Sequence, residues 1–388
     1  MSPRRRCLAQ RRRTMGYSQE RLAERLGVDR TTIARWESGE TAPLAGLRPR
    51  VASVLGLSLE QLDDMLDDIA PTDSSNDDRL TRAMASPAGI DLVAIARLRD
   101  SVQELDRRYD TAPSTSLLAD TGQCLAQAAF LRAHAISGKT RRELLIVETE
   151  AAILMARLVW DASQRRDHRT AKTHLDRAAA TARQLHDPVA EGHALLRRSF
   201  VALYGENDAQ AGLCLTKRSA ELTAQQSPAL AGLAILHTAE AHAILGDFNE
   251  CEAALARAQD CLAGSGPDDV SAELLSPAHY GRLAGSCYLF LNAPARAEPV
   301  LRTTAEALSG QTKSQAIVLG NLALALIRQR KIEEAASCLN RAIDVVETTR
   351  GGGGVNIVFR ACQELRPWRS EPDVDDVHDR LLMLMAST

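Results

Sequence analysis

Small residues recur beyond residue 114 at a spacing typical of stacked helix pairs. Five predicted helices each open with a small residue, and the spacings between these residues are 40, 40, 46 and 38. The five markers and the residues seven positions later are Ala171 and Ala178, Ala211 and Arg218, Cys251 and Ala258, Ala297 and Thr304, and Ala335 and Ala342. Arg218 is not small, so the register of that unit is open by one residue. The recurrence predicts a repeat architecture in which each unit buries its apolar face against its neighbours.

Two segments show the repeating unit most clearly: LHTAEAHAILGDFNECEAALARAQ and GNLALALIRQRKIEEAASCLNRAI. Each has an apolar helix, a short polar turn and a second helix with small residues, and this pattern resembles tetratricopeptide repeats. The resemblance implies a superhelix whose concave groove is lined by the first helix of each pair. A position that commonly faces this groove in the family lies fourteen residues before each marker. In this chain these positions are Arg157, Arg197, His237, Leu283 and Asn321.

Four of these five groove positions are polar or basic, and they are the candidate ligand-binding residues: Arg157, Arg197, His237 and Asn321. Arginine can bond both oxygens of a carboxylate, and asparagine can bond a peptide backbone through its donor and its acceptor together. We therefore expect an anionic ligand, such as a peptide terminus. The alternative is that the arginines are solvated or paired with acids and that His237 is a half-buried structural histidine.

A short segment near the start of the chain, SQERLAERLGVDRTTIARWESG at 18–39, predicts two helices that meet at Gly27. Glycine is the residue best able to end a helix in a left-handed conformation. Ser18 is a predicted N-cap for the first helix. In the second helix Ile33 and Trp36 continue an apolar side. The residues left facing outward are Arg30, Thr31, Thr32 and Arg35, and such a face suits the major groove of DNA.

This segment resembles the helix-turn-helix of Cro/CI-type (Xre) regulators over residues 8–66. The resemblance implies that the second helix enters the major groove and that Gln19 contacts a phosphate. Base and backbone contacts would then fall on Arg30, Thr31, Thr32 and Arg35. Pro49 departs from the family pattern, because it falls where the fourth helix usually continues; that helix is expected to start late or kink. The spacing of Ser58 and Gln61 predicts a capping box for a fifth helix. The alternative is a small helical module that binds another protein.

Charge supports binding to DNA. Residues 1–50 contain twelve arginines, no lysine and five acids, a balance of +7, whereas the whole chain is −3. A basic segment on an acidic chain is the electrostatic pattern of a duplex-binding module, since neutralising phosphates releases counterions. Within it, Arg11 and Arg12 are predicted to contact the DNA backbone from a helix edge.

Residues 68–89 are rich in Asp, Ser and Pro and lack helical periodicity, which predicts a flexible linker. A helix at 90–111 follows. Its apolar residues are spaced 3, 4, 3 and 4 as in a coiled-coil seam: Ile95, Leu98, Val102, Leu105 and Tyr109. Two heptads leave two alternatives open, namely dimerisation through this helix or packing against the following repeats.

Other classes of protein find little support in the sequence. His237 and His242 are five residues apart and do not share a helix face as zinc ligands would, so no metal is expected. The GGGG run at 351–354 lacks the Lys and Ser/Thr of a phosphate loop and predicts a hinge before a terminal cap. No HExxH or GxSxG occurs, so we expect neither an enzyme nor a cofactor. The eight dispersed cysteines and the missing apolar span predict a cytoplasmic protein.

The sequence therefore predicts an all-α protein. It has a five-helix DNA-binding domain at 1–67, a linker at 68–89, and a tetratricopeptide-like solenoid at 90–388 with repeats at about 143–348 and a cap at 355–386. The predicted function is that of a bacterial, homodimeric transcription regulator that binds double-stranded DNA and senses a peptide, small-molecule or protein ligand. The alternative is a scaffold whose repeats bind a partner protein and whose N-terminal domain only localises it.

Overall fold

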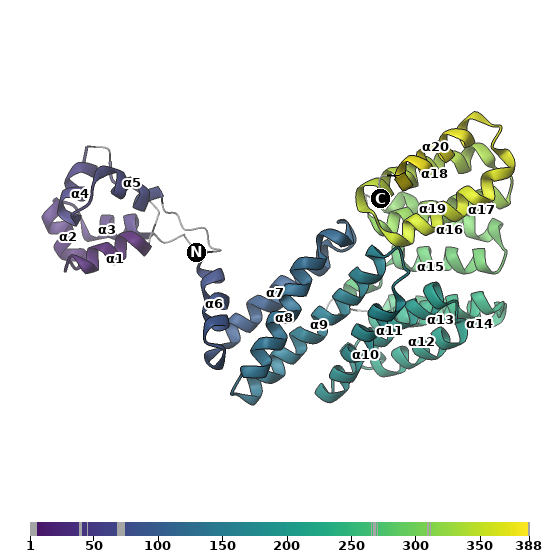
Figure 1. Cartoon of the computed structure of the whole chain (residues 1–388), viewed down its shortest axis with the longest axis horizontal. Helices are drawn as coiled ribbons and strands as arrows, with labels where there is room; N and C mark the ends of the chain where they lie inside the picture. The colour runs from purple at the N-terminus through teal and green to yellow at the C-terminus, as the bar shows by residue number, and fades with distance from the viewer. Residues whose placement is uncertain are drawn as a thin grey trace. The chain divides into compact units, whose positions relative to one another are not determined.

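The computed structural model is helical throughout its regular structure in the residues that it describes: 6–38, 41–44, 46–67, 74–264, 266, 269, 271–308, 310 and 312–386. The all-α prediction is confirmed. The chain divides into two compact units, Met1–Ser86 and Pro87–Thr388, which we call the head and the body. Figure 1 labels the helices of each unit in chain order.

Five short helices of the head surround one apolar core. They are α1 (Arg6–Thr14), α2 (Gln19–Leu26), α3 (Arg30–Ser38), α4 (Arg48–Leu55) and α5 (Leu59–Asp67). Leu22 and Leu26 of α2 and Ile33 and Trp36 of α3 are all at most 4% exposed, so the apolar sides read from the sequence face inward. Burying such side chains is what holds helices this short together, because they would be marginal alone.

The predicted helix ends of the head are confirmed by their hydrogen bonds. The Ser18 hydroxyl accepts from the backbone of α2 as an N-cap, and Gly27 ends that helix with φ 72°. The Ser58 N–H donates to Gln61 Oε1 at 3.0 Å while the Gln61 N–H donates to Ser58 Oγ at 3.1 Å, which is the reciprocal capping box. Pro49 lies in the first turn of α4, where its missing N–H costs nothing.

Part of the predicted linker is helical. Residues 74–85 form α6 (Ser74–Ala85), which a 3-10 turn, η1 (Pro87–Gly89), follows; residues 68–73 lie outside the described residues. The Asp, Ser and Pro content of the segment argued against a helix, but its second part, RLTRAMA, consists mostly of good helix formers. The prediction that the whole linker is non-helical is corrected for 74–85.

The body consists of antiparallel helices that pack in succession (Figure 1). The first two are α7 (Leu92–Arg108) and α8 (Leu118–His134). Six pairs follow: α9 (Gly138–Ala162) with α10 (His168–Leu185), α11 (Pro188–Val201) with α12 (Ala209–Thr223), α13 (Pro228–Leu245) with α14 (Phe248–Gly264), α15 (Pro277–Phe290) with α16 (Pro294–Ala307), α17 (Lys313–Arg328) with α18 (Ile332–Thr349), and α19 (Gly352–Leu365) with α20 (Pro372–Ala386).

The small marker residues are buried where the helices of the body meet, with one shift of register. Ala171, Cys251, Ala297 and Ala335 are all fully buried. In α12 the buried small residues with the seven-residue spacing are Gly212 and Ser219, one position later than Ala211 and Arg218. The shift has a local cause, because a π-helical turn at Ala202–Glu206 adds a residue between α11 and α12.

The seam residues of α7 are used within the chain. Ile95, Leu98, Val102 and Leu105 are 1–6% exposed, and α7 packs mainly on α9. The sequence left open whether this helix dimerises or packs against the repeats. In the structure the apolar side of α7 packs against the repeats. Helix α13 is apolar and long enough to cross a membrane, but 83% of it is buried inside the body, so it is the core helix of this unit.

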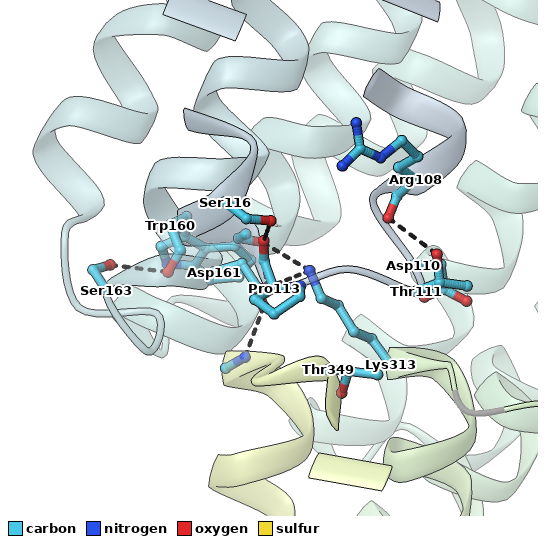
Figure 2. A network of polar contacts seen from close by, with 12 residues as sticks. Arg108, Asp110, Thr111, Pro113, Ser116, Trp160, Asp161, Ser163, Lys313 and Thr349 are labelled. Carbon is cyan, nitrogen blue, oxygen red and sulfur yellow. Dashed lines mark hydrogen bonds and ion pairs between the residues drawn. The ribbon is translucent and has the colours of Figure 1, made fainter. Parts of the chain in front are cut away.

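A buried polar cluster joins the beginning of the body to its end (Figure 2). Asp161, at the end of α9, accepts from Lys313 Nζ at 2.9 Å and from the Ser114 hydroxyl at 2.7 Å. Its other oxygen accepts from the backbone N–H of Gly352 at 2.8 Å, so it also caps α19. We call these four residues the clasp. Because 199 residues separate Ser114 from Lys313, the clasp closes the superhelix on itself.

The glycine run packs in the clasp and is not a hinge. A Cβ on Gly352 would lie 2.6 Å from the carbonyl oxygen of Asp161, and one on Gly353 would lie 2.1 Å from the Arg165 guanidinium. The glycines therefore let the first turn of α19 approach the end of α9. The sequence reading of a hinge at 351–354 is corrected: the run permits a close contact between distant repeats.

We predict that breaking the clasp is costly. In Lys313→Met the Asp161 carboxylate stays buried without its cation, so the free energy of unfolding should fall by about 3–5 kcal/mol in urea denaturation followed by circular dichroism. The matched control is Lys331→Met. It removes a 2.7 Å ion pair with Glu298 in which the Lys331 side chain is 41% exposed, and it should cost less than about 1 kcal/mol. Equal losses in the two variants would contradict the role of the clasp.

Candidate functional site

The first candidate site is the outer face of α3. Its Arg30 side chain is 65% exposed, Thr31 and Arg35 are exposed, and Thr32 is half-buried. Arg30 Nε lies 2.6 Å from a carboxylate oxygen of Glu20 on α2, an exposed pair that water screens. Behind this face the buried Ile33 and Trp36 fix the helix to the core of the head. A short helix is thus held rigidly with hydroxyl and guanidinium groups directed outward.

Glu37 fixes the position of Gln19. The Glu37 carboxylate accepts from Gln19 Nε2 at 2.7 Å and from Arg12 Nε at 2.6 Å, and Arg12 also donates to the Tyr17 carbonyl at 2.7 Å. The Arg12 side chain is only 7% exposed. The sequence position of Arg12 predicted a contact with the DNA backbone. In the structure its guanidinium bonds groups within the head instead and links α1 to α3.

Arg11 also has partners within the head. Its Nε donates to the carbonyl of Leu55 at 2.9 Å and its Nη2 to the carbonyl of Gly56 at 2.8 Å. These carbonyls lie at the end of α4, where a cation is favoured by the helix dipole. We therefore no longer propose Arg11 or Arg12 as DNA contacts, whereas Gln19, Arg30, Thr31, Thr32 and Arg35 remain proposed.

The second candidate site is a cavity of about 360 Å³ in the body, which we call the central cavity. The first helix of every pair contributes to its wall, as the repeat pattern implied. Representative residues are Arg157 from α9, Arg197 from α11, His237 from α13, Arg282 from α15, Lys313 from α17 and Gly353 from α19. The end of α7 covers the cavity with Asp106 and Tyr109.

Three of the four groove residues named from sequence meet in this cavity. Arg157, Arg197 and His237 line it, whereas Asn321 does not and is 4% exposed in the middle of α17. Leu283, the apolar position of the series, is 1% exposed. Asn321 lies two turns beyond Lys313 on the same helix, so α17 reaches the cavity with its first turn. The prediction of Asn321 as a groove residue does not match the structure.

Sequence reasoning missed Arg165, Arg282, Lys313 and His279, all of which line the cavity. Arg282 is adjacent to Leu283, so a register error of one residue concealed it. Arg165 and Lys313 lie in a loop and at a helix start, outside the repeat positions that the pattern covers. Among the described residues no group of three His, Cys, Asp or Glu could hold a metal ion.

Asp106 neutralises Arg157 at one side of the cavity. The two side chains form an ion pair, and the Tyr109 ring lies 4.0 Å from the Arg157 guanidinium. Burial disfavours the Arg157 cation, but Asp106 outweighs it and the pKa of Arg157 is raised. Among the described residues no carboxylate forms an ion pair with Arg197, and burial and the neighbouring Arg157 lower the pKa of Arg197 to about 9. The positive charge of the cavity is thus concentrated away from α7.

A buried network fixes the opposite wall. The Tyr204 hydroxyl donates to Glu240 and lies 2.8 Å from His237 Nδ1, while Ser286 Oγ donates to the other oxygen of Glu240 at 2.6 Å. Tyr204 belongs to the π-helical turn after α11, which directs its ring into the cavity. Burial lowers the pKa of His237 despite Glu240 beside it.

Comparisons with known proteins address the head directly. Residues 8–62 match the family model described as Helix-turn-helix (HTH_3). The head contains a helix-turn-helix domain. The matched residues include α2 and α3. In DNA-binding helix-turn-helix domains the second helix of the motif lies in the major groove. No curated protein sequence matches this chain.

Three solved structures share the helical architecture at 10–11% sequence identity. The apo form of the quorum sensor NprR from B. thuringiensis covers 82% of this chain and 95% of its own, with a TM-score of 0.46. A STAND ATPase with a tetratricopeptide repeat sensor from Pyrococcus horikoshii covers 94% and 63%, with a score of 0.41. Yeast Tom70 covers 92% and 83%, with a score of 0.34. At these scores the likeness is distant and assigns no function to this chain.

We predict that acid destabilises the body through His279. Burial, Arg282 on its own helix and Arg197 on α11 lower the pKa of His279 to about 4 from 6.5, and His237 on α13 contributes less. Between these values the unfolded chain binds a proton that the folded chain does not, so the free energy of unfolding falls as pH drops from 6.5 toward 4. In His279→Gln the loss between pH 7 and pH 5 in urea denaturation should be smaller. An unchanged loss would contradict this assignment.

Proposed function

We propose that this protein is a sequence-specific transcription regulator. In this proposal residues 1–67 bind duplex DNA through α3, and the body senses a ligand in the central cavity without catalysing a reaction. The supporting observation is the matched helix-turn-helix with an exposed Arg30, Thr31 and Arg35 over a rigid core. Arginine can bond guanine bidentately, and threonine offers both a hydroxyl and a methyl group to base edges. We also propose a bacterial, cytoplasmic setting, where such a regulator meets DNA.

The cavity supports the sensing part of the proposal. Asp106 and Tyr109, at the end of α7, form part of its wall, and α7 is the first α-helix after the head along the chain. A ligand that contacts α7 and the repeats together would favour one arrangement of the superhelix over another. It alters DNA binding only if its affinity for the two arrangements differs, and typical couplings are about 1–3 kcal/mol.

We predict that α3 determines both affinity and sequence preference. The preferred duplex is first selected by the full chain from random DNA, and binding is then measured by fluorescence anisotropy. Arg30→Ala and Arg35→Ala should each weaken binding by about 1–3 kcal/mol and relax the preference at one base position. Arg341→Ala, on an exposed part of the body, is the control. Binding should also weaken as salt increases.

A failure to bind DNA would contradict this proposal. If the full chain enriches no duplex and shows no salt-dependent binding, the regulator proposal is wrong, and the scaffold alternative, in which the body binds a partner protein, takes its place.

We further predict that the full chain acts as a homodimer on two half-sites. One helix-turn-helix contacts only a few base pairs, and paired half-sites about a helical turn apart raise its affinity. The apolar side of α7 is covered within the chain, so the interface must use other surfaces. Sedimentation velocity at micromolar concentration should give a dimer, or two chains per selected duplex. A monomer alone, with and without DNA, would refute this prediction.

A further inference from the structure

The lining of the central cavity contains more basic side chains than acidic ones, and several of the basic side chains are not neutralised. Its acids are Asp106, Asp110, Asp161 and Glu273. Asp106 pairs with Arg157, Asp161 pairs with Lys313, and Asp110 accepts from the backbone N–H and hydroxyl of Ser314. Glu273 is exposed. Among the described residues Arg165, Arg197 and Arg282 have no carboxylate partner. Buried or half-buried guanidinium groups without counter-charges favour an anion.

The unsatisfied polar atoms of the cavity are all donors. Arg157 Nε, Arg282 Nε and the Trp160 indole Nε1 are buried and, within the described part of the chain, have no hydrogen-bond partner. Among the described residues that line the cavity, no buried side-chain acceptor lacks a hydrogen-bond partner. Native proteins rarely leave buried donors unpaired, and each such group costs about 1–3 kcal/mol. The cavity therefore lacks a group that supplies acceptors.

Aromatic rings form the rest of the wall. The chain has only five Phe, five Tyr and three Trp, yet Tyr109, Trp160, Phe200 and Tyr204 line this one cavity. The Arg165 guanidinium lies 5.0 Å from the Trp160 ring and 5.5 Å from the Tyr204 ring, and Arg197 lies 5.2 Å from the Phe200 ring. Such an array of rings and planar guanidinium groups suits a flat ligand that can stack.

The size of the cavity and the ion pair in its wall argue against an extended chain as the ligand. At about 360 Å³ it lies near the lower end of the roughly 300–1,000 Å³ found for small-molecule sites. The clasp residues Asp161 and Lys313 both line it, so the contact that joins the first repeats to the last also bounds the available space. An extended peptide along the groove would have to open this buried pair.

We propose that the central cavity binds a small aromatic anion, a carboxylate or a phosphate monoester. The anionic group lies between Arg197 and Arg282, and the ring stacks against Trp160 and Tyr204. The inference rests on the proposed sensing function and narrows its ligand from a peptide, small molecule or protein to one chemical class. Asp106 acts as an internal competitor, because its carboxylate already neutralises Arg157 and faces Arg197.

The test uses isothermal titration calorimetry on the full chain with four small probes and one peptide. The probes are 2-naphthoate, 2-naphthyl phosphate, 2-naphthamide and acetate, and the peptide is an acidic heptapeptide. We expect one naphthalene anion to bind with one-to-one stoichiometry, and the two acids show which anionic group is preferred. The neutral naphthamide and the ringless acetate should each bind at least about tenfold more weakly, a difference of about 1.4 kcal/mol.

Variants locate the probe within the chain. Arg282→Gln should weaken binding of the preferred naphthalene anion at least about tenfold, and Arg341→Gln on the exposed side of α18 should leave it unchanged. Asp106→Asn removes the internal competitor and should tighten binding. This gain of affinity keeps the proposal testable even if an arginine variant unfolds. Circular dichroism of each variant establishes that the body is folded.

The outcomes separate this inference from the proposed function. Equal binding of naphthoate and naphthamide, equal binding of acetate, or no binding of either naphthalene anion would overturn the ligand class. Tighter binding of the heptapeptide than of both naphthalene acids would overturn it as well and would leave a sensor of peptides. Selection of a duplex by the full chain is measured independently. Its failure would refute the regulator while naphthoate binding could still stand.

Discussion

The body depends on one buried ion pair, between Asp161 and Lys313. In a solenoid each helix pair contacts only the pairs next to it in the chain, so the repeat pattern provides no contact between the first repeats and the last. Here the carboxylate of Asp161 joins the first repeat pair to α17 through Lys313 and to α19 through the N–H of Gly352. Asp110 adds a parallel contact with the first turn of α17. The first and last repeats of the superhelix are thereby joined, and both residues of the ion pair line the central cavity.

The arginines on the first helices of the pairs give the central cavity its positive charge. Arginines from several first helices converge on the concave side, where burial and the neighbouring Arg157 lower the pKa of Arg197. Two acids relieve part of this repulsion, Asp161 through the clasp and Asp106 at the end of α7. The remaining cations are held by the fold at a cost that an anionic ligand would offset. In the proposed function, Asp106 would link ligand binding to DNA binding, because it lies on α7, the first α-helix after the head along the chain.

The head was largely predictable, because its signals are local. A capping box at Ser58 and Gln61, the N-cap at Ser18 and the left-handed Gly27 involve residues three or four positions apart, and local physics fixes such contacts. The exceptions were Arg11 and Arg12. Both are basic residues on a helix edge, and only the folded head brings Glu37 and the carbonyls at the end of α4 within their reach.

The sequence by itself determined the all-α class, the helix pairs and three groove residues, because side-chain periodicity along a helix decides which face is buried. Tertiary structure decided the rest. Arg282 and Lys313 enter the cavity, and Asn321 stays out of it, because the superhelix turns and closes. The glycine run at 351–354 reads as a hinge in isolation and becomes a close contact only because Asp161 lies opposite it. Contacts between residues nearly two hundred positions apart leave no periodic trace in the sequence, so only the assembled fold reveals them.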